Sequence, residues 1–308
     1  SIVAMHRQDL QTNSDSAERE SFHQASPNSR EETGSETERR FPERLNKEHI
    51  KNLPLLAFEG KIHLISETKD LSDAIKILRR DSILGFDITD VMFKGSAEDL
   101  KKTDITQPAI FIHSTILFTI NSTNAHAYAG HSLGEFSALS CSGSLIFEDA
   151  LKLVLIRARA MHKACKNNET TMAAILGLDD SSVNTICDNI PNVVTANYNC
   201  PGQIVISGSK NSIDKACKSI KEIGGKTIIL PVGGAFHSPY MESAKKELED
   251  AIMSLKFSKP DKPIYQNFDA NPHLDIEKIK NNLINQLTSP VLWTQTINKL
   301  IADNYKLF

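Results

Sequence analysis

A serine framed by glycines, between a short apolar run and a helix-forming run, constrains the fold of this chain more than any other feature. The stretch is HAYAGHSLGEFSAL, residues 126–139, in which Gly130, Ser132 and Gly134 fit the pattern G-x-S-x-G. Where a strand turns sharply into a helix, such a serine takes a strained backbone conformation, and only small neighbours fit beside it. The pattern predicts a strand over 125–130, a tight turn, a helix from about Gly134, and a nucleophilic hydroxyl on Ser132.

The predicted turn also creates a place for negative charge. The backbone N–H of Leu133 would point at the reacting carbonyl oxygen, and the start of the following helix favours an oxyanion there. The alternative is that this five-residue pattern is an ordinary turn formed by chance. The apolar run before it and the helical run after it favour the nucleophile.

A serine nucleophile needs a base, and the ten histidines differ in their surroundings. His237 follows the strand-like run TIILPV and a glycine pair, where a strand end would present its side chain. We therefore predict His237 as the base. His113 and His126 lie in apolar runs and are predicted to be structural. His131 adjoins the nucleophile, leaves the turn on the other side, and is predicted to contact substrate.

One arginine lies on the apolar face of a predicted helix. In the helix 147–166, Arg157 shares a face with Leu153, Val154 and Met161, whereas Arg159 falls off that face and should be exposed. A guanidinium in apolar surroundings must find an anion, since an unpaired buried charge is very costly. Two hypotheses remain: a structural salt bridge in the core, or bidentate recognition of a substrate carboxylate.

Alternating helical and extended patterns predict an α/β protein. Residues 172–232 give the order strand, helix, strand, strand, helix, strand, which is the ferredoxin-like βαββαβ arrangement. We predict a small lobe, 171–233, inserted into a large lobe made of 51–170 and 234–308. A strand is expected at 263–268. Helices of the large lobe are expected at 71–80, 96–102, 104–121, 147–166, 238–255 and 276–287.

Composition narrows the class of protein. Residues 11–40 are polar and nearly free of large aliphatic side chains, so we predict that residues 1–50 are disordered. A net charge of −3 argues against nucleic acid or membrane as partners. Five widely spaced cysteines without a CxxC pair favour reduced thiols inside a cell and no metal site. No run approaches the roughly 20 apolar residues of a membrane span.

Seven fragments between roughly residues 72 and 308 are informative when taken together. They are TQPAI, AGHSLGEFSAL, VLIRARAM, MAAILGLDD, ANYNCPGQIVISG, GAFHSPYM and QLTSPVLW. In their order and spacing they resemble the malonyl-CoA:acyl-carrier-protein transacylases. The resemblance implies an α/β-hydrolase-like large lobe with an inserted ferredoxin-like small lobe. It also implies an enzyme of fatty acid biosynthesis that needs no cofactor, since malonyl-CoA is a substrate.

The resemblance implies a role for each matching residue of the reaction centre. Malonyl-CoA would acylate Ser132, and the phosphopantetheine thiol of an acyl-carrier protein would then take the malonyl group. His237 would be general base and then acid, held by the backbone carbonyl of Gln286 instead of an acidic side chain. Arg157 would pair with the malonyl carboxylate.

Four further residues are implied to line the substrate pocket. They are Gln107, His131, Asn199 and Phe236, the last in the "AFH" form associated with malonyl selectivity. A methyl branch is worth only about 1–3 kcal/mol in such a pocket, so the implied selectivity is substantial but incomplete. The expected partners are malonyl-CoA and the carrier protein, and the expected state is a monomer.

The sequence departs from the family in two places. It lacks the GQGxQ loop, whose backbone gives the family a second oxyanion donor, and the closing Gly-Pro-Gly segment. Losing one such donor costs about a hundred- to a thousandfold in rate. The departure predicts an incomplete gene model, a fragment or a weakened enzyme.

Several alternatives remain open at this point. The chain could be an acyltransferase module of a polyketide synthase, a serine hydrolase, or a non-catalytic relative. A hydrolase predicts an acidic side chain on the base histidine and no need for Arg157. Lys215, Lys218 and Lys221 form either a carrier-docking surface or an ordinary solvated helix face. The expected compartment is a bacterium-derived organelle, a plastid or mitochondrion, with the cytoplasm as the alternative.

Overall fold

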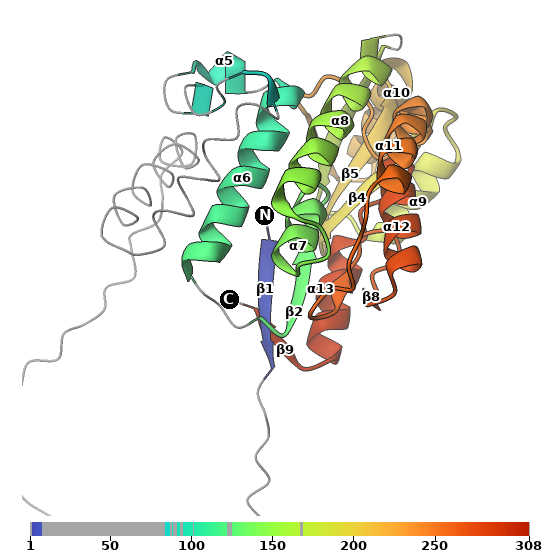
Figure 1. Cartoon of the computed structure of the whole chain (residues 1–308). Coiled ribbons are helices and arrows are strands. Elements are labelled where there is room, and N and C mark those ends of the chain that lie inside the picture. Colours follow the sequence, from blue (N-terminus) through green and yellow to red (C-terminus); the bar gives the residue numbers. More distant parts are fainter. Residues whose placement is uncertain are drawn as a thin grey trace, which may run out of the picture.

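Two β-sheets and their covering helices make up the part of the chain that can be described (Figure 1). The structure is a computed structural model, and it describes residues 2–7, 84–86, 88, 91–92, 95–100, 102–121, 125–166 and 169–307. The two sheets have separate apolar cores, one large and one small. The serine turn leaves the larger sheet.

The larger sheet has five strands in the order β8-β7-β2-β1-β9 and is mixed. Its central strand β2 pairs in parallel with β7 and antiparallel with β1. Every residue of β2 is buried, as its uninterrupted apolar sequence requires. The strands are β1 (Ile2–Arg7), β2 (Ala127–Gly130), β7 (Ile264–Tyr265), β8 (Pro272–His273) and β9 (Tyr305–Leu307).

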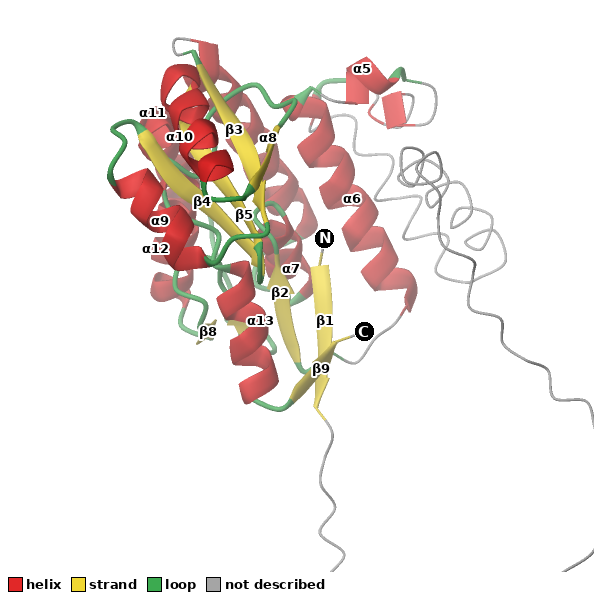
Figure 2. Cartoon of the chain, turned by 180° about the vertical axis from the view of Figure 1, so that it is seen from behind, coloured by secondary structure: helices red, strands yellow, loops and turns green. Residues whose placement is uncertain are grey.

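The smaller sheet has four strands in the order β4-β5-β3-β6, all paired antiparallel (Figure 2). The chain order is strand, helix, strand, strand, helix, strand, which is the order expected for residues 172–232. The apolar side chains Ile213, Ala216 and Ile220 of α10 are buried over the sheet. The elements are β3 (Thr170–Leu176), α9 (Asp180–Asp188), β4 (Val193–Cys200), β5 (Gln203–Ser209), α10 (Lys210–Glu222) and β6 (Lys226–Ile229).

The remaining helices belong to the larger part of the molecule. Helices α6 and α8 lie side by side, and α11 packs on α8 (Figure 1). The large core lies between these helices and the five-stranded sheet. The helices are α5 (Ala97–Leu100), α6 (Thr103–Asn121), α7 (Gly134–Cys141), α8 (Phe147–Lys166), α11 (Glu242–Ser254), α12 (Ile276–Asn285) and α13 (Trp293–Ala302), with 3-10 turns at Pro239–Met241 and Gln286–Thr288.

Several predicted elements are confirmed at the level of single residues. Helix α8 has the bounds expected from its apolar stripe, and α7 begins at Gly134. Ser96 caps the start of α5, because the backbone N–H of Asp99 donates to Ser96 Oγ and Ser96 donates back to the Asp99 carboxylate. None of the described helices combines the length and apolarity that crossing a bilayer requires.

Other predictions are wrong or lie outside the described residues. Residues 2–7 were expected to be disordered, but they form β1 between β2 and β9. Averaging composition over 50 residues hid the apolar opening run IVAM, whose strand partners lie more than a hundred residues away. The strand expected at 263–268 covers only β7. The helix expected at 71–80 and the rest of the predicted disordered segment, 8–50, lie outside the described residues.

Candidate active site

The predicted strand–turn–helix around Ser132 is present. Strand β2 ends at Gly130, α7 begins at Gly134, and Ser132 between them has a φ of 50°, in the left-handed region. A Cβ on Gly130 would lie 2.0 Å from the backbone carbon of Gly134, so the helix can approach the strand only if residue 130 is glycine. The half-buried serine is therefore held on a strained turn at the start of a helix.

His237 lies against this serine, in the loop after β6. Ser132 Oγ and His237 Nε2 are 2.7 Å apart, although the two residues are 105 positions apart in the chain. His237 Nδ1 lies 2.9 Å from the backbone oxygen of Gln286. A carbonyl oxygen can only accept a hydrogen bond, so Nδ1 carries the proton and Nε2 is free to accept the serine proton.

The environment keeps this imidazole neutral. Burial, followed by the positive charge of Arg157, lowers the pKa of His237 to about 3. At neutral pH the ring is therefore unprotonated. It is ready to act as a base towards Ser132.

Arg157 on α8 is the third member of the cluster and is almost completely buried. Its Nη2 donates to Ser132 Oγ at 2.8 Å, and its Nη1 donates to Gln107 Oε1 at 2.6 Å. Burial lowers the pKa of Arg157 to about 10, so it stays charged. Within the described ranges no carboxylate lies within 4.0 Å of the guanidinium, and the hypothesis of a direct core salt bridge finds no support.

The small sheet contributes to the site through β4. His131 Nε2 lies 2.9 Å from Asn199 Oδ1, and the His131 ring packs edge-on against Trp293 of α13. Burial lowers the pKa of His131. The predicted pocket residues His131 and Asn199 thus join the two sheets next to Ser132.

The two remaining predicted residues flank the reacting pair. Leu133 precedes α7, and in the described structure its backbone N–H has no hydrogen-bond partner, as expected at a helix start. Phe236 is half-buried and packs against both the large core and the cluster of Met172, Ala196 and Val205. All nine predicted site residues therefore lie in one region around Ser132 or on the elements that form it.

Asn267 is a polar residue of the site that sequence reasoning missed. Its Oδ1 accepts the Ser132 backbone N–H at 2.6 Å, and its Nδ2 donates to the Gly130 carbonyl at 2.7 Å. It is fully buried just after β7. The sequence shows only that an amide follows a short apolar strand. It does not show which turn the Asn267 side chain contacts.

Glu135 was missed as well, although it is fully buried three residues after Ser132. It accepts from Gln266 Nε2 at 2.8 Å, from the Asn267 backbone at 2.9 Å and from Gln286 Nε2 at 3.0 Å. The rule applied to Arg157, that a charge among apolar residues needs a partner, would have singled it out. It lies between Gly134 and Phe136, in the otherwise uncharged run GEFSALSC.

The serine, histidine and arginine geometry agrees with a family match. Residues 68–308 match the family model described as an acyl transferase domain. The chain belongs to this acyl transferase family. "Malonyl CoA-acyl carrier protein transacylase" of Staphylococcus aureus (strain MRSA252) is 38% identical over 231 residues, covering 73% of this chain and 75% of that protein. The Bacillus subtilis (strain 168) protein of the same name is 36% identical over 253 residues, covering 78% and 80%.

Solved structures agree with this assignment of the acyl transferase. An acyl carrier protein S-malonyltransferase from Vibrio cholerae superposes with a TM-score of 0.74 at 34% identity, covering 78% of this chain and 81% of that one. The malonyl CoA-acyl carrier protein transacylase from Coxiella burnetii gives 0.73 at 33%, covering 75% and 76%. The α/β fold with its mixed sheet is thus shared with these enzymes.

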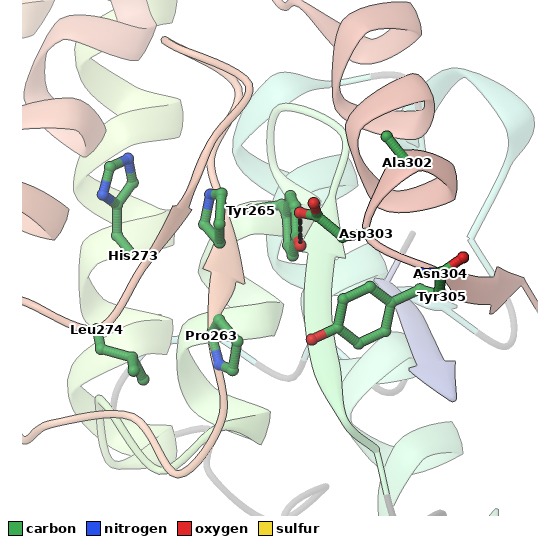
Figure 3. A pocket seen from close by; sticks show the side chains of 9 residues that line it. Pro263, Tyr265, His273, Leu274, Ala302, Asp303, Asn304 and Tyr305 are labelled. Atoms are coloured by element: carbon green, nitrogen blue, oxygen red, sulfur yellow. Dashed lines mark hydrogen bonds between the residues drawn. The ribbon is translucent and has the colours of Figure 1, made fainter. Parts of the chain in front are cut away.

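A hollow of the acyl transferase lies away from Ser132. It has a volume of about 500 Å³ and lies between the β7–β8 segment and the end of α13 (Figure 3). Across it, Tyr265 Oη donates to Asp303 Oδ2 at 2.6 Å. Its lining includes none of the residues that surround the serine, so the chemistry is assigned to the Ser132 cluster.

Proposed function

We propose that this chain is a malonyl-CoA:acyl-carrier-protein S-malonyltransferase that works through a Ser132 ester. The single observation that carries the proposal is the contact of Ser132 Oγ with both His237 Nε2, at 2.7 Å, and Arg157 Nη2, at 2.8 Å. In a malonyl ester the carboxylate carbon lies two C–C bonds, about 1.5 Å each, from the acylated carbonyl. An arginine that touches the nucleophile is therefore within reach of that carboxylate.

The first half-reaction forms the ester. Ser132 Oγ attacks the thioester carbonyl while its proton passes to His237 Nε2. The resulting oxyanion faces the Leu133 N–H at the start of α7. The C–S bond then breaks, and the leaving sulfur of coenzyme A takes the proton from His237.

The second half-reaction runs the same chemistry in reverse. The carrier-protein thiol gives its proton to His237 and attacks the ester carbonyl, and the Ser132 oxygen leaves and recovers that proton. Arg157 holds the malonyl group in one orientation in both halves, while Gln107, His131, Asn199 and Phe236 shape the pocket. The buried arginine–carboxylate pair would also help to exclude water.

The base geometry favours a transferase over the hydrolase hypothesis. A hydrolase was expected to place an acidic side chain on the histidine, but His237 Nδ1 is held by the Gln286 backbone carbonyl. One solved relative, a type II PKS acyl-carrier protein in complex with its malonyl-transacylase, is 31% identical with a TM-score of 0.72. That relative supports a carrier protein as the natural acceptor here.

The finer domain description also belongs to this proposal. We assign an α/β-hydrolase-like large lobe to 51–170 and 234–308, joined by β1, and a ferredoxin-like small lobe to 171–233. The antiparallel order β4-β5-β3-β6 and the separate small core support this division. A monomer in a bacterium-derived organelle, or alternatively in the cytoplasm, completes the proposal; the Lys-, Asn- and Ile-rich sequence motivates the organelle.

Radiolabelled malonyl-CoA tests the proposal directly. Label should form on wild-type protein, be absent in Ser132→Ala, and move to added holo-carrier protein. Acetyl-CoA should label far less, because it lacks the carboxylate that Arg157 would bind. Release of free malonate with carrier protein present would instead show a hydrolase, and no label on folded wild-type protein would support the non-catalytic relative.

A further inference from the structure

One buried carboxylate has no part in the proton transfers described above. Glu135 lies in the first turn of α7 with no exposed surface. Its two oxygens accept three N–H donors at 2.8–3.0 Å, from the Gln266 side chain, the Asn267 backbone and the Gln286 side chain. A buried acid with three donors is a built arrangement, and two of the donors, Asn267 and Gln286, also contact the reacting residues.

The Asn267 branch leads to the nucleophile. The Asn267 backbone N–H is fixed by Glu135 Oε2, while its side chain bonds to the Ser132 N–H and the Gly130 carbonyl. These two side-chain bonds hold both ends of the left-handed turn. Glu135 therefore holds Asn267 in place, and Asn267 holds the backbone of Ser132.

Gln286 connects Glu135 to His237 and to Arg157. The Gln286 Nε2 donates to Glu135 Oε2 and to the Ser132 carbonyl, both at 3.0 Å. Its backbone oxygen accepts from His237, and its Oε1 lies 3.4 Å from Arg157 Nη2. The Gln286 amide thus stands between two buried opposite charges, with its nitrogen towards Glu135 and its oxygen towards Arg157.

The donor pattern indicates that Glu135 is ionised. All three partners present N–H groups, and an ionised carboxylate is an acceptor only. Burial is the largest influence and raises the pKa of Glu135 above its ordinary value, while the three hydrogen bonds and Arg157 oppose it and favour the carboxylate form. The carboxylate form also balances the buried charge of Arg157 at a distance, through the Gln286 amide.

We propose that Glu135 is the positioning residue of this site, whose carboxylate aligns the Ser132 hydroxyl with the His237 imidazole by holding Asn267 and Gln286 in place. The inference deepens the proposed malonyl transfer. It concerns how readily Ser132 reacts, whichever acyl donor is used. A probe that carries no carboxylate can therefore test it separately.

Phenylmethylsulfonyl fluoride supplies such a test. The Ser132 oxygen displaces fluoride at sulfur while its proton passes to His237, so the rate constant reports the serine–histidine alignment. Glu135→Ala removes both carboxylate oxygens and so all three hydrogen bonds, and misplacement of reacting groups by about 1 Å costs about a hundredfold. We expect a rate constant about a hundredfold lower, with the final amount of modified Ser132 unchanged in folded protein.

The conservative variant Glu135→Gln should restore most of the rate. Its side-chain oxygen can still accept from Asn267 and Gln286, while its nitrogen faces Gln266 Nε2, so that only the bond to Gln266 is lost. Charge-assisted bonds are about twice as strong as neutral ones, so we expect a rate about three- to tenfold below wild type. Malonyl-CoA labelling should slow in parallel, with the malonyl-CoA KM within about threefold of wild type.

Leu248→Ala, in the core on α11, is the matched control for lost stability. It should lower the final amount of modified protein as it unfolds, but leave the rate constant of the folded fraction unchanged. Equal rate constants for wild type and Glu135→Ala would overturn the inference, as would equal slowing by Ala and Gln. If Glu135→Ala does not fold, a wild-type rate constant for Glu135→Gln overturns it. An unreactive wild-type Ser132 would instead contradict the proposed function.

Discussion

At the scale of single residues, the reacting pair depends on two backbone conformations that L-amino acids rarely adopt. Ser132 and His237 have φ values of 50° and 53°, and each such conformation costs about 1–3 kcal/mol. Asn267 accepts the backbone N–H of Ser132, and the Gln286 carbonyl holds the His237 ring. The two residues that exchange a proton thus both have a strained backbone.

Arg157→Gln should reduce selectivity for malonyl-CoA. Removing one partner of a buried charged pair costs 2–5 kcal/mol, so malonyl labelling of Ser132 should fall about a hundredfold. Acetyl labelling should fall much less, because acetyl-CoA brings no carboxylate to the site. The measurement is the ratio of the two labelling rates.

Arg159→Gln is the control, since Arg159 lies two residues along the same helix and is exposed, as predicted. It should keep the wild-type ratio of malonyl to acetyl labelling. An Arg157→Gln variant that also keeps this ratio would refute the carboxylate contact.

The buried His237 should make stability depend on pH. Its pKa is about 3 in the folded chain and about 6.5 when unfolded, so below pH 6.5 the unfolded state binds more protons. The contribution of this group to the free energy of unfolding is therefore fully present above pH 6.5. It decreases as the pH is lowered, by roughly 2 kcal/mol between pH 7 and pH 5. Urea unfolding at pH 7 and pH 5 measures this decrease in the free energy of unfolding. In His237→Gln the decrease should be smaller than in wild type by about that amount. An equal pH dependence in the two proteins would contradict the depressed pKa.

The sequence predicts the residues that react with or bind the substrate better than the buried residues that hold them in place, Asn267 and Glu135. Ser132 and His237 follow from a turn pattern and a strand end, and Arg157 from a charge on an apolar face. The role of Asn267 cannot be predicted in this way, because its side chain binds the backbone of Ser132, which is 135 residues away in the chain. Sequence spacing carries no information about that distance.

At the scale of elements, the turn from β2 to α7 requires close approach of strand and helix at Gly130. Gly130→Ala would force a Cβ to within 2.0–2.6 Å of three backbone atoms of Gly134 and Glu135, which cannot move independently. Overpacking of this kind should lower the free energy of unfolding by about 3 kcal/mol. It should also displace Ser132 and slow its acylation. Urea unfolding and labelling rates measure the two effects.

Gly233→Ala is the matched substitution. A Cβ at Gly233 would meet nothing within 4 Å, so its effect on the free energy of unfolding should be within about 1 kcal/mol of zero. If both alanines cost the same, close approach at Gly130 is not what the turn requires.

The long amphipathic helix α8 was predicted well, whereas the extent of β7 and the existence of β1 were not. Helix α8 shows its apolar stripe over 20 residues, so its bounds follow from the sequence. Strand β7 is only Ile264–Tyr265, because the next residues leave the sheet to bind Glu135 and Ser132. Strand β1 could not be predicted from its own surroundings, since its pairing partners are β2 and β9.

At the scale of the whole molecule, the small sheet carries an exposed basic helix face. Lys215, Lys218 and Lys221 are all exposed on α10, so both hypotheses for this face remain open. Changing the three to Glu should raise the KM for an acidic carrier protein by about tenfold at low salt. The effect should shrink as salt is added, and Ser132 labelling by malonyl-CoA should not change.

The control is a second triple variant, with the same change of three lysines to glutamates away from α10. Lys246, Lys256 and Lys259 are exposed on or just after α11, in the large lobe. Their replacement by Glu should leave the carrier KM near wild type. Equal KM values for the two triple variants would show that α10 is an ordinary solvated face.

The contact between β4 and the segment after Gln286 connects the four-stranded sheet to the base. Val291 forms a bridge with Asn197 and exchanges backbone bonds with Ala196 and Tyr198, only five residues beyond the carbonyl that holds the imidazole. Leu292 is in turn bonded to the backbone of Asn267. A displacement of β4 would therefore be transmitted through Val291 to the segment that ends at the Gln286 carbonyl, and so to the orientation of the imidazole.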